Sequence, residues 1–490
     1  MVMPMTETQR KVGFLVCLVT IVLAVLDMQI VSAATVPIVR DLDPDHGIDK
    51  IPWLVSAFSL ASAAMLPLYG KLCDVLGAKQ VFLGAVGTFL AGSALCGAAQ
   101  SIGQLIAARA VQGVGAGGLM SVTMVVIAQL KGPGEKDAKG GGMGGIVAGG
   151  GMAIGPWIGG LLSDHASWRW IFYVNLPLGL AVLALAAYVL KLPRHTAGHS
   201  IDFLGAGLAA AFSTSLLLVA EWGGKEYAWS SPQIVSLALA SVAALGLFLW
   251  RQITAAEPIL PLSMFRVREL RWGFAIQGLM GAAMVAAMYY VMVYLQVVRG
   301  VPSASAGLYL IPMAIGMTVV GIVSGKLAER GWQERTFVIG GSAITAVAFL
   351  LLATTGSTTS LWWLRAELLL IGAGFGQLIG QLIQLVQDAA PRHQLGVATT
   401  GIRFFQTLGT ALGASLFGTL ITRLYDGPGP LASLSGAART AGVESYVSAM
   451  DGVFVCGAAL MAVCLVLAVR LPRSRPAQGI SEPAREAVAA

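Results

Sequence analysis

The chain has 490 residues, of which 56% are hydrophobic and only 11% are charged, and its mean hydropathy is +0.78. Soluble domains contain about 25% charged residues, so this composition excludes an ordinary soluble protein. The net charge of +7 suggests a nucleic-acid partner, but the placement of the charges argues against one. With the N-terminus in the cytoplasm, 21 of the 31 Lys and Arg residues fall on inside segments and 7 on outside segments, as the positive-inside rule requires.

Apolar runs long enough to cross a membrane recur along the whole chain. A spanning helix needs about 20 predominantly apolar residues. The first run is too long for the apolar core of a signal peptide and lacks a small-residue cleavage site, so we read it as the first span. The sequence predicts fourteen spans, near residues 12–34, 51–70, 80–98, 103–130, 141–163, 168–190, 201–221, 232–252, 271–297, 304–325, 335–354, 361–387, 396–422 and 447–470.

Two motifs repeat at nearly the same offset, which predicts two related halves. GKLCDVLG (Gly70–Gly77) follows span two and GKLAERG (Gly325–Gly331) follows span ten, and Arg109 and Arg365 lie in matching spans. Two repeats separated by an insertion are a common transporter design. We predict a cytoplasmic N-terminus (1–11), a six-span bundle (12–190), two inserted spans with flanking loops (191–270), a second six-span bundle (271–470) and a disordered cytoplasmic tail (471–490).

Asp27 lies about 22 Å into the first span, at about 1.5 Å per residue. A carboxylate inside a membrane is costly, so it should face a cavity, find a partner or take up a proton. Desolvation favours the protonated form and a nearby cation favours the charged form, a competition that suits proton coupling. Arg109 in span four is the candidate partner, because a guanidinium stays charged. The alternatives are a static ion pair for Asp27 and backbone carbonyl partners for Arg109.

Two glycine-containing segments indicate conformational change. GKLCDVLG pairs Asp74 with Lys71 and Lys79 in a predicted cytoplasmic turn, where charged contacts can form in only one conformer. In span five, GGGMAIGPWIGG has glycines at a spacing of four, which permits close helix packing, and a proline that kinks the helix. The conformational residues that we predict are Gly70, Asp74, Gly77, Lys79, Gly113, Gly151, Gly155, Pro156, Gly159 and Gly160.

Polar and polarizable stripes on two later spans are candidates for substrate contact. Gln377, Gln381 and Gln384 share one face of span twelve, where lipid exposure would be unfavourable. Span nine carries methionines at a spacing of four beside tyrosines, which suits either a broad-specificity cavity or ordinary packing. The candidates in span nine are Met284, Met288, Tyr289 and Tyr290.

Catalytic, metal and nucleotide sites are not predicted. The five histidines fall in loops, no His, Cys, Asp or Glu cluster within the spans has metal-ligand spacing, and GVGAGG at Gly113 lacks the Lys-Ser/Thr of a phosphate-binding loop. We therefore expect no enzyme activity, no metal, no cofactor and no ATP-driven pumping, with the proton gradient as the energy source.

Taken together, the motifs resemble those of the major facilitator superfamily, and specifically its fourteen-span drug:proton antiporters. GKLCDVLG is similar to the loop motif between spans two and three, LIAARAVQGVGAGG (Leu105–Gly118) to the span-four motif, and GxxxGPxxGG to the antiporter motif of span five. WRWIFYVNLPLG (Trp168–Gly179) and YLQVVRGVPSASAGLYLIP (Tyr294–Pro312) also fit that branch. The chain departs from the pattern at Gln406, where the family has Arg, while Arg403 lies one turn earlier.

The resemblance implies an all-α membrane protein that exports amphipathic organic compounds in exchange for protons by alternating access. It implies Asp27 and Arg109 as the proton-coupling pair. No acid occurs in spans ten or thirteen, which argues against a dicationic drug preference. We expect a monomer in the bacterial cytoplasmic membrane with both termini inside, and small molecules, protons and lipid as its partners. A dedicated exporter of one natural product, an importer and a membrane sensor are the alternatives.

Overall fold

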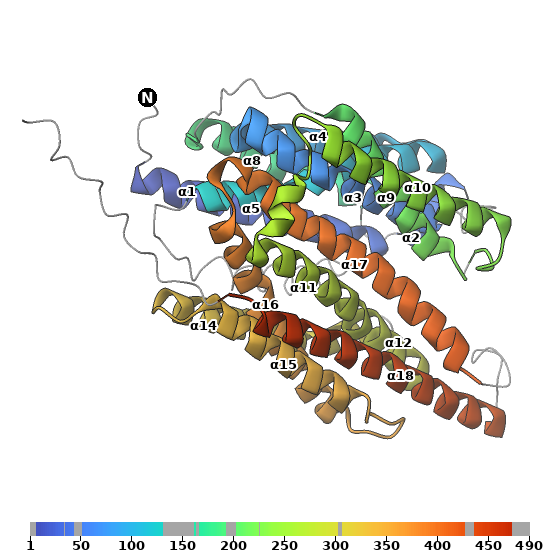
Figure 1. Cartoon of the computed structure of the whole chain (residues 1–490). Helices are drawn as coiled ribbons and strands as arrows, with labels where there is room; N and C mark the ends of the chain where they lie inside the picture. The colour runs from blue at the N-terminus through green and yellow to red at the C-terminus, as the bar shows by residue number, and fades with distance from the viewer. Residues whose placement is uncertain are drawn as a thin grey trace, which may run out of the picture.

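Helices make up nearly all of the regular structure in the described part of the chain (Figure 1). The computed structural model describes residues 6–33, 35–43, 51–130, 161–162, 166–192, 202–224, 226–301, 306–426 and 436–472. The helices before residue 200 are α1 (Glu7–Ala33), α2 (Thr35–Leu42), α3 (Ile51–Leu76), α4 (Ala78–Ala98), α5 (Ile102–Leu130), α7 (Trp170–Tyr173) and α8 (Asn175–Val189). They are followed by α9 (Phe203–Trp222) and α10 (Pro232–Thr254).

The second half begins with α11 (Arg268–Val285) and α12 (Val291–Val293), which continue each other through π-helical turns at Ala286–Tyr290 and Tyr294–Val298. The later helices are α14 (Ile311–Glu329), α15 (Glu334–Leu352), α16 (Leu361–Ala389), α17 (Leu395–Leu424) and α18 (Gly436–Val469). Short 3-10 turns occur at Leu262–Arg266, Gly307–Leu310 and Arg392–Gln394.

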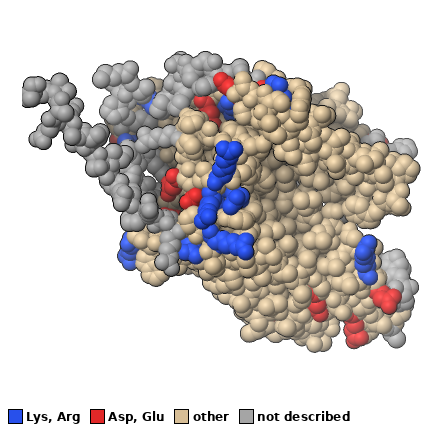
Figure 2. Space-filling view, in the orientation of Figure 1, with Lys and Arg blue, Asp and Glu red and all other residues tan. Residues whose placement is uncertain are grey.

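The described residues contain 13 helical segments long and apolar enough to cross a membrane. Most of the predicted fifth span, 141–163, lies outside the described residues, so the total of fourteen stays a prediction. Large apolar side chains point outward, for example Tyr188, which is 84% exposed, and Trp362, which is 75% exposed, as lipid-facing residues would. In Figure 2, charged side chains gather toward opposite ends of the visible face, with uncharged surface between them.

Two sequence-based boundaries were wrong. The last span, predicted to begin near residue 447, begins earlier, because α18 is helical from Gly436 with a polar first part. The motif predicted as a turn, Gly70–Gly77, is helical through Leu76, since α3 extends past its apolar run. Only Gly77 leaves the helix, with φ of 89°, and Gly331 in the repeated motif has φ of 97°. Glycine adopts this conformation at little cost, which explains the motif's final residue in both halves.

The helices pack as two groups that meet along α3 and α17. On one side α5 packs against α3, α4 and α1, and α8 packs against α1 and α4. On the other side α16 packs against α14 and α15, and α11 packs against α17. Figure 1 shows α4 and α8 on one side of the molecule and α14, α15 and α18 on the other. The inserted helix α9 packs on α10 and also contacts both α3 and α17.

Equivalent glycines bring the central helices of each group together. A methyl group at Gly113 of α5 would collide with the carbonyl oxygen of Phe58 on α3, and one at Gly372 of α16 would collide with the carbonyl oxygen of Met313 on α14. Close backbone approach through small residues is the main way in which membrane helices associate tightly. The repeat seen in the sequence is therefore also a repeat of helix packing.

Substituting Gly113 with Ala is expected to destabilise the protein by about 1–3 kcal/mol, because α5 would have to move away from α3. The measurement is the melting temperature in detergent. Gly103→Ala is the matched control on the same helix, since a methyl group there meets nothing within 4 Å. Equal melting temperatures for both variants and the wild type would contradict this packing argument.

Candidate functional site

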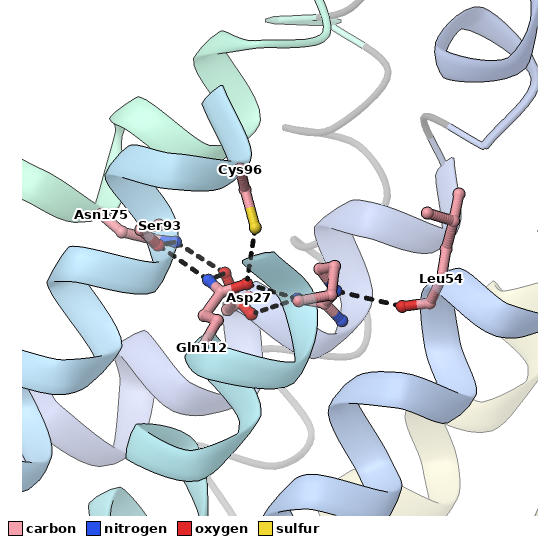
Figure 3. A network of polar contacts seen from close by, with 7 residues as sticks. Asp27, Leu54, Ser93, Cys96, Gln112 and Asn175 are labelled. Atoms are coloured by element: carbon pink, nitrogen blue, oxygen red, sulfur yellow. Dashed lines mark hydrogen bonds and ion pairs between the residues drawn. The ribbon is translucent and has the colours of Figure 1, made fainter. Parts of the chain in front are cut away.

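Asp27 is held at the centre of a buried polar network formed by five helices (Figure 3). Its Oδ1 accepts hydrogen bonds from the side-chain amides of Gln112, at 2.8 Å, and Asn175, at 2.6 Å. Its Oδ2 accepts a bond from Nη1 of Arg109 at 3.2 Å. The carboxylate is 1% exposed and Arg109 is 2% exposed. Each oxygen of this buried acid is therefore satisfied by protein donors, as a desolvated charge requires.

Arg109 keeps partners that do not depend on the charge of Asp27. Its Nε donates to the backbone carbonyl of Leu54 at 3.1 Å, and its Nη1 donates to Oε1 of Gln112 at 2.7 Å. The guanidinium also lies 4.1 Å from the centre of the Phe58 ring, which adds a cation–π contact. Both sequence-based alternatives for Arg109 are thus present together, since it pairs with Asp27 and also bonds a backbone carbonyl.

Three polar members of the network were missed by sequence reasoning. Ser93, in the second half of α4, accepts bonds from Gln112 at 2.7 Å and from Asn175 at 3.0 Å. Gln112 lies one turn after Arg109 on α5, and this spacing was the available signal for it. Asn175 begins α8, within the Trp168–Gly179 motif, which fits the fourteen-span branch but does not by itself indicate a partner for Asp27. The thiol of Cys96 approaches Oε1 of Gln112 at 3.7 Å.

A contact outside the spans fixes the segment that carries Asn175. Asp41, in the last turn of α2, accepts bonds from the indole of Trp168 at 2.9 Å and from Nη1 of Arg169 at 2.7 Å. These two donors hold the pKa of Asp41 below its ordinary value. The contact lies just before α7 and α8, so it anchors the start of α8, where Asn175 reaches Asp27.

Asp74 lies near the C-terminal end of α3, at the other end of this helix from Leu54, and connects the two groups of helices there. Its Oδ1 accepts from the backbone N–H of Gly396 at 2.8 Å, and its Oδ2 accepts from that of Val397 at 3.0 Å. These donors belong to the first turn of α17, which has no side-chain cap of its own. A carboxylate is stabilising there, because the first N–H groups of a helix lack partners within it. Gly70 allows the approach, since a side chain there would collide with Thr400.

Lys71 and Lys79, which the sequence paired with Asp74, contact residues outside this motif. Lys71 forms an ion pair with Glu257, which follows the inserted helix α10, at 3.3 Å. Lys79 donates to the carbonyl oxygen of Ala187 near the end of α8 at 2.6 Å. Glu221 at the end of α9 is hydrogen-bonded to Ser56 of α3. The inserted helices are therefore joined to α3 near both of its ends.

The candidate substrate residues lie in the second half, and their environments differ. Gln381 and Gln384 are buried, and Oε1 of Gln381 has no partner among the described residues. Gln377 packs toward Gly340 of α15. On the continuation of α11, Tyr290 is buried against Phe417, whereas Tyr289 is 59% exposed.

Met284 and Met288 are partly buried against the core of the second half. The π-helical turn at Ala286–Tyr290 includes Met288, and such turns are frequent at functional sites. The predicted residues Gly151, Gly155, Pro156, Gly159 and Gly160 lie outside the described residues. Within the described ranges, no group of three or more His, Cys, Asp or Glu side chains could hold a metal ion.

Comparison with known proteins identifies the family. The sequence model of the Major Facilitator Superfamily matches residues 17–414. The chain belongs to this superfamily. It is thus a multi-pass membrane transporter, as the sequence motifs indicated.

Its relatives include bacterial transporters that are longer than this chain. An uncharacterized MFS-type transporter of Mycobacterium tuberculosis, Rv1877, is 33% identical over 95% of this chain and 70% of its own length. The multidrug transporter protein MdtP of Bacillus subtilis is 33% identical over 85% of this chain and 76% of its own. The crystal structure of the human organic anion transporter MFSD10 superposes with a TM-score of 0.60 at 17% identity, over 92% of this chain and 99% of that one, which shows a shared fold.

Replacing Asp74 with Ala is expected to open the contact between α3 and α17. Loss of two hydrogen bonds to a charged group should shift the closed–open equilibrium by about tenfold or more. A cysteine at Thr400, which is 1% exposed beside Gly70, reports the opening through its rate of maleimide labelling in a background without native cysteines.

The matched control for this experiment is Asp426→Ala, which removes one negative charge just beyond the far end of α17. It should leave the labelling rate unchanged. If Asp74→Ala also leaves the rate unchanged, the carboxylate does not hold this end closed.

Proposed function

We propose that this transporter exports amphipathic organic compounds from the cytoplasm in exchange for protons, and that Asp27 carries the proton. The single observation that supports this most strongly is the buried ion pair of Asp27 with Arg109 and the set of neutral partners around it. We further propose a monomer in the bacterial cytoplasmic membrane with both termini inside, in keeping with the distribution of Lys and Arg.

The network suits a carboxyl group that changes protonation. Removing one partner of a buried ion pair normally costs about 3–5 kcal/mol, because the other charge is left unpaired. In this network Arg109 retains the Leu54 carbonyl, the Gln112 amide oxygen and the Phe58 ring when Asp27 is neutral. Protonation of Asp27 therefore does not leave the guanidinium without partners, which favours a titrating acid over a static ion pair.

Helix α3 offers a physical route from the proton site to the contact between the halves. Leu54 and Phe58 near its start hold Arg109, whereas Gly70 and Asp74 near its end contact α17. Leu54 and Asp74 lie about 30 Å apart along the helix, at about 1.5 Å per residue. Pro67 lies between them and removes one backbone hydrogen bond, which makes this helix easier to bend. A change at Asp27 that moves the start of α3 would thus alter the stability of the contact at its end.

The driving force is sufficient for export. One proton supplies about 1.4 kcal/mol per pH unit and about 2.3 kcal/mol per 100 mV of membrane potential. Their sum would sustain a gradient of roughly 10³ for a neutral solute. The outward direction is supported by relatives that carry the names multidrug transporter and multidrug resistance protein at 33% and 32% identity.

Asp27→Asn is expected to abolish export driven by a pH gradient, because the amide cannot bind and release a proton while it retains a similar shape. The measurement is uptake of a fluorescent amphipathic dye into inverted proteoliposomes with an imposed pH gradient. Asp426→Asn serves as the control, since Asp426 is exposed just beyond the end of α17 and takes no part in the network of Asp27.

Transport by Asp27→Asn at the wild-type rate would exclude Asp27 as the coupling residue. Dye movement in the direction opposite to export under the same gradient would exclude the antiporter as a whole. A melting temperature near that of the wild type shows that the variant is folded.

A further inference from the structure

Helix α17 carries a polar stripe opposite its apolar exposed side. Arg403, Gln406, Thr407 and Thr410 recur at the spacing of one helix face. Arg403 and Gln406 are partly exposed and Thr410 is exposed. On the other side of the helix, Leu412 and Leu416 are 51% and 45% exposed, as lipid-facing residues would be. The polar stripe therefore faces away from lipid.

Arg403 is the unusual member of this stripe. Its Nη1 donates to Oε1 of Gln406 at 3.0 Å, and the amide nitrogen of Gln406 approaches the sulfur of Met284 at 3.9 Å. Its Nε is buried without a hydrogen-bond partner, and among the described residues Arg403 makes no ion pair. Helix α17 contains no acidic residue. An arginine within a membrane span without a counter-charge is costly unless something else supplies that charge.

Two further unpartnered polar groups lie at a similar depth on neighbouring helices. Gln277 of α11 is fully buried, and neither of its amide atoms has a hydrogen-bond partner in the described part of the chain. The same is true of Oε1 of the buried Gln381 on α16. The depth follows from contacts between the helices. On α11, Phe274 lies against Gly401 of α17, and the adjacent residue, Gly273, lies against Val386 of α16. These contacts define one level across the three helices. At about 1.5 Å per residue, Arg403 lies about 3 Å from that level, Gln277 about 5 Å and Gln381 about 8 Å. All three are displaced in the same direction across the membrane.

The second half thus contrasts with the first. Around Asp27 the polar atoms satisfy one another, whereas among the described residues Nε of Arg403, both amide atoms of Gln277 and Oε1 of Gln381 have no hydrogen-bond partner. A partly exposed cation, with unpartnered buried amide groups at a similar depth on neighbouring helices, suits a site for a negatively charged ligand. A guanidinium binds carboxylate groups particularly well, because its N–H donors match the two oxygens.

We propose that Arg403, assisted by Gln406, binds an acidic group of the transported compound, so that the preferred substrates are amphipathic molecules bearing a carboxylate or a similar anion. This inference rests on the proposed function for the direction of transport. The second half would thus select the substrate class. Met284, beside Gln406, supplies an apolar contact for the rest of the transported molecule.

A matched pair of dyes tests the proposal by equilibrium binding. Rhodamine 110 carries a free carboxylate, and rhodamine 123 is its methyl ester. Fluorescence anisotropy with the purified full-length protein in detergent gives Kd for each dye, without a proton gradient. We expect the wild type to bind rhodamine 110 more tightly than its ester. Arg403→Gln should weaken rhodamine 110 binding at least about tenfold, or about 1.4 kcal/mol, and change rhodamine 123 binding less than about twofold.

Arg423→Gln removes the same charge from the exposed end of α17 and should change neither Kd. Arg403→Lys keeps the charge without the planar fork, so it should fall between the wild type and Arg403→Gln. It also serves as the test variant if Arg403→Gln does not fold.

The proposal is overturned if the wild type does not favour rhodamine 110, if it binds neither dye, or if Arg403→Gln weakens both dyes equally. The last result would mean that Arg403 only supports the helix. Because binding is measured without a gradient, a failure of proton coupling at Asp27 would leave this result unaffected, and the two proposals can fail separately.

Discussion

The packing of the first half depends on one requirement: the carboxylate of Asp27 must receive hydrogen bonds within the membrane. Asp27 on α1 receives hydrogen bonds from side chains on α5 and α8, while α4 supplies a hydroxyl that holds two of those donors in place. An unpartnered charge at this depth would be strongly unfavourable. The helices of the first half must therefore pack with these polar groups in register, and any movement of one of them changes the environment of the acid.

The two halves use polar groups in different ways although they repeat one packing plan. Glycine crossings and glycine-terminated helices occur in both. The first half encloses a complete network around an acid, whereas in the described part of the second half Nε of Arg403 and the amides of Gln277 and Gln381 have atoms without a hydrogen-bond partner. This difference is consistent with a division of work in which one half handles protons and the other handles the compound. Helices α3 and α17, which carry the contact between the halves, each also carry a residue that takes part in one of these sites.

The spans and the buried charged residues could be predicted from the sequence, because a charge or a polar backbone group in the membrane has a large energetic cost. Charged residues in apolar runs are rare, so Asp27 and Arg109 stood out, and the length of those runs gave most span positions. Ser93 and Asn175 were not predicted, because neutral polar residues are common in spans and only the packing brings these two beside Asp27. The cap that Asp74 provides for α17 joins residues 322 positions apart, so no local pattern could reveal it. Arg403 was noticed as a departure from the family, but only the structure shows that it has no acidic partner among the described residues.

The central claim, that Asp27 gains and loses a proton, is tested most directly by infrared difference spectroscopy during a pH titration of the purified protein. The account predicts a carboxyl band that appears as the pH falls, shifts when a transported dye is added, and is missing from Asp27→Asn. The same spectrum in the wild type and Asp27→Asn would mean that Asp27 does not titrate, and that its pairing with Arg109 is a fixed structural contact.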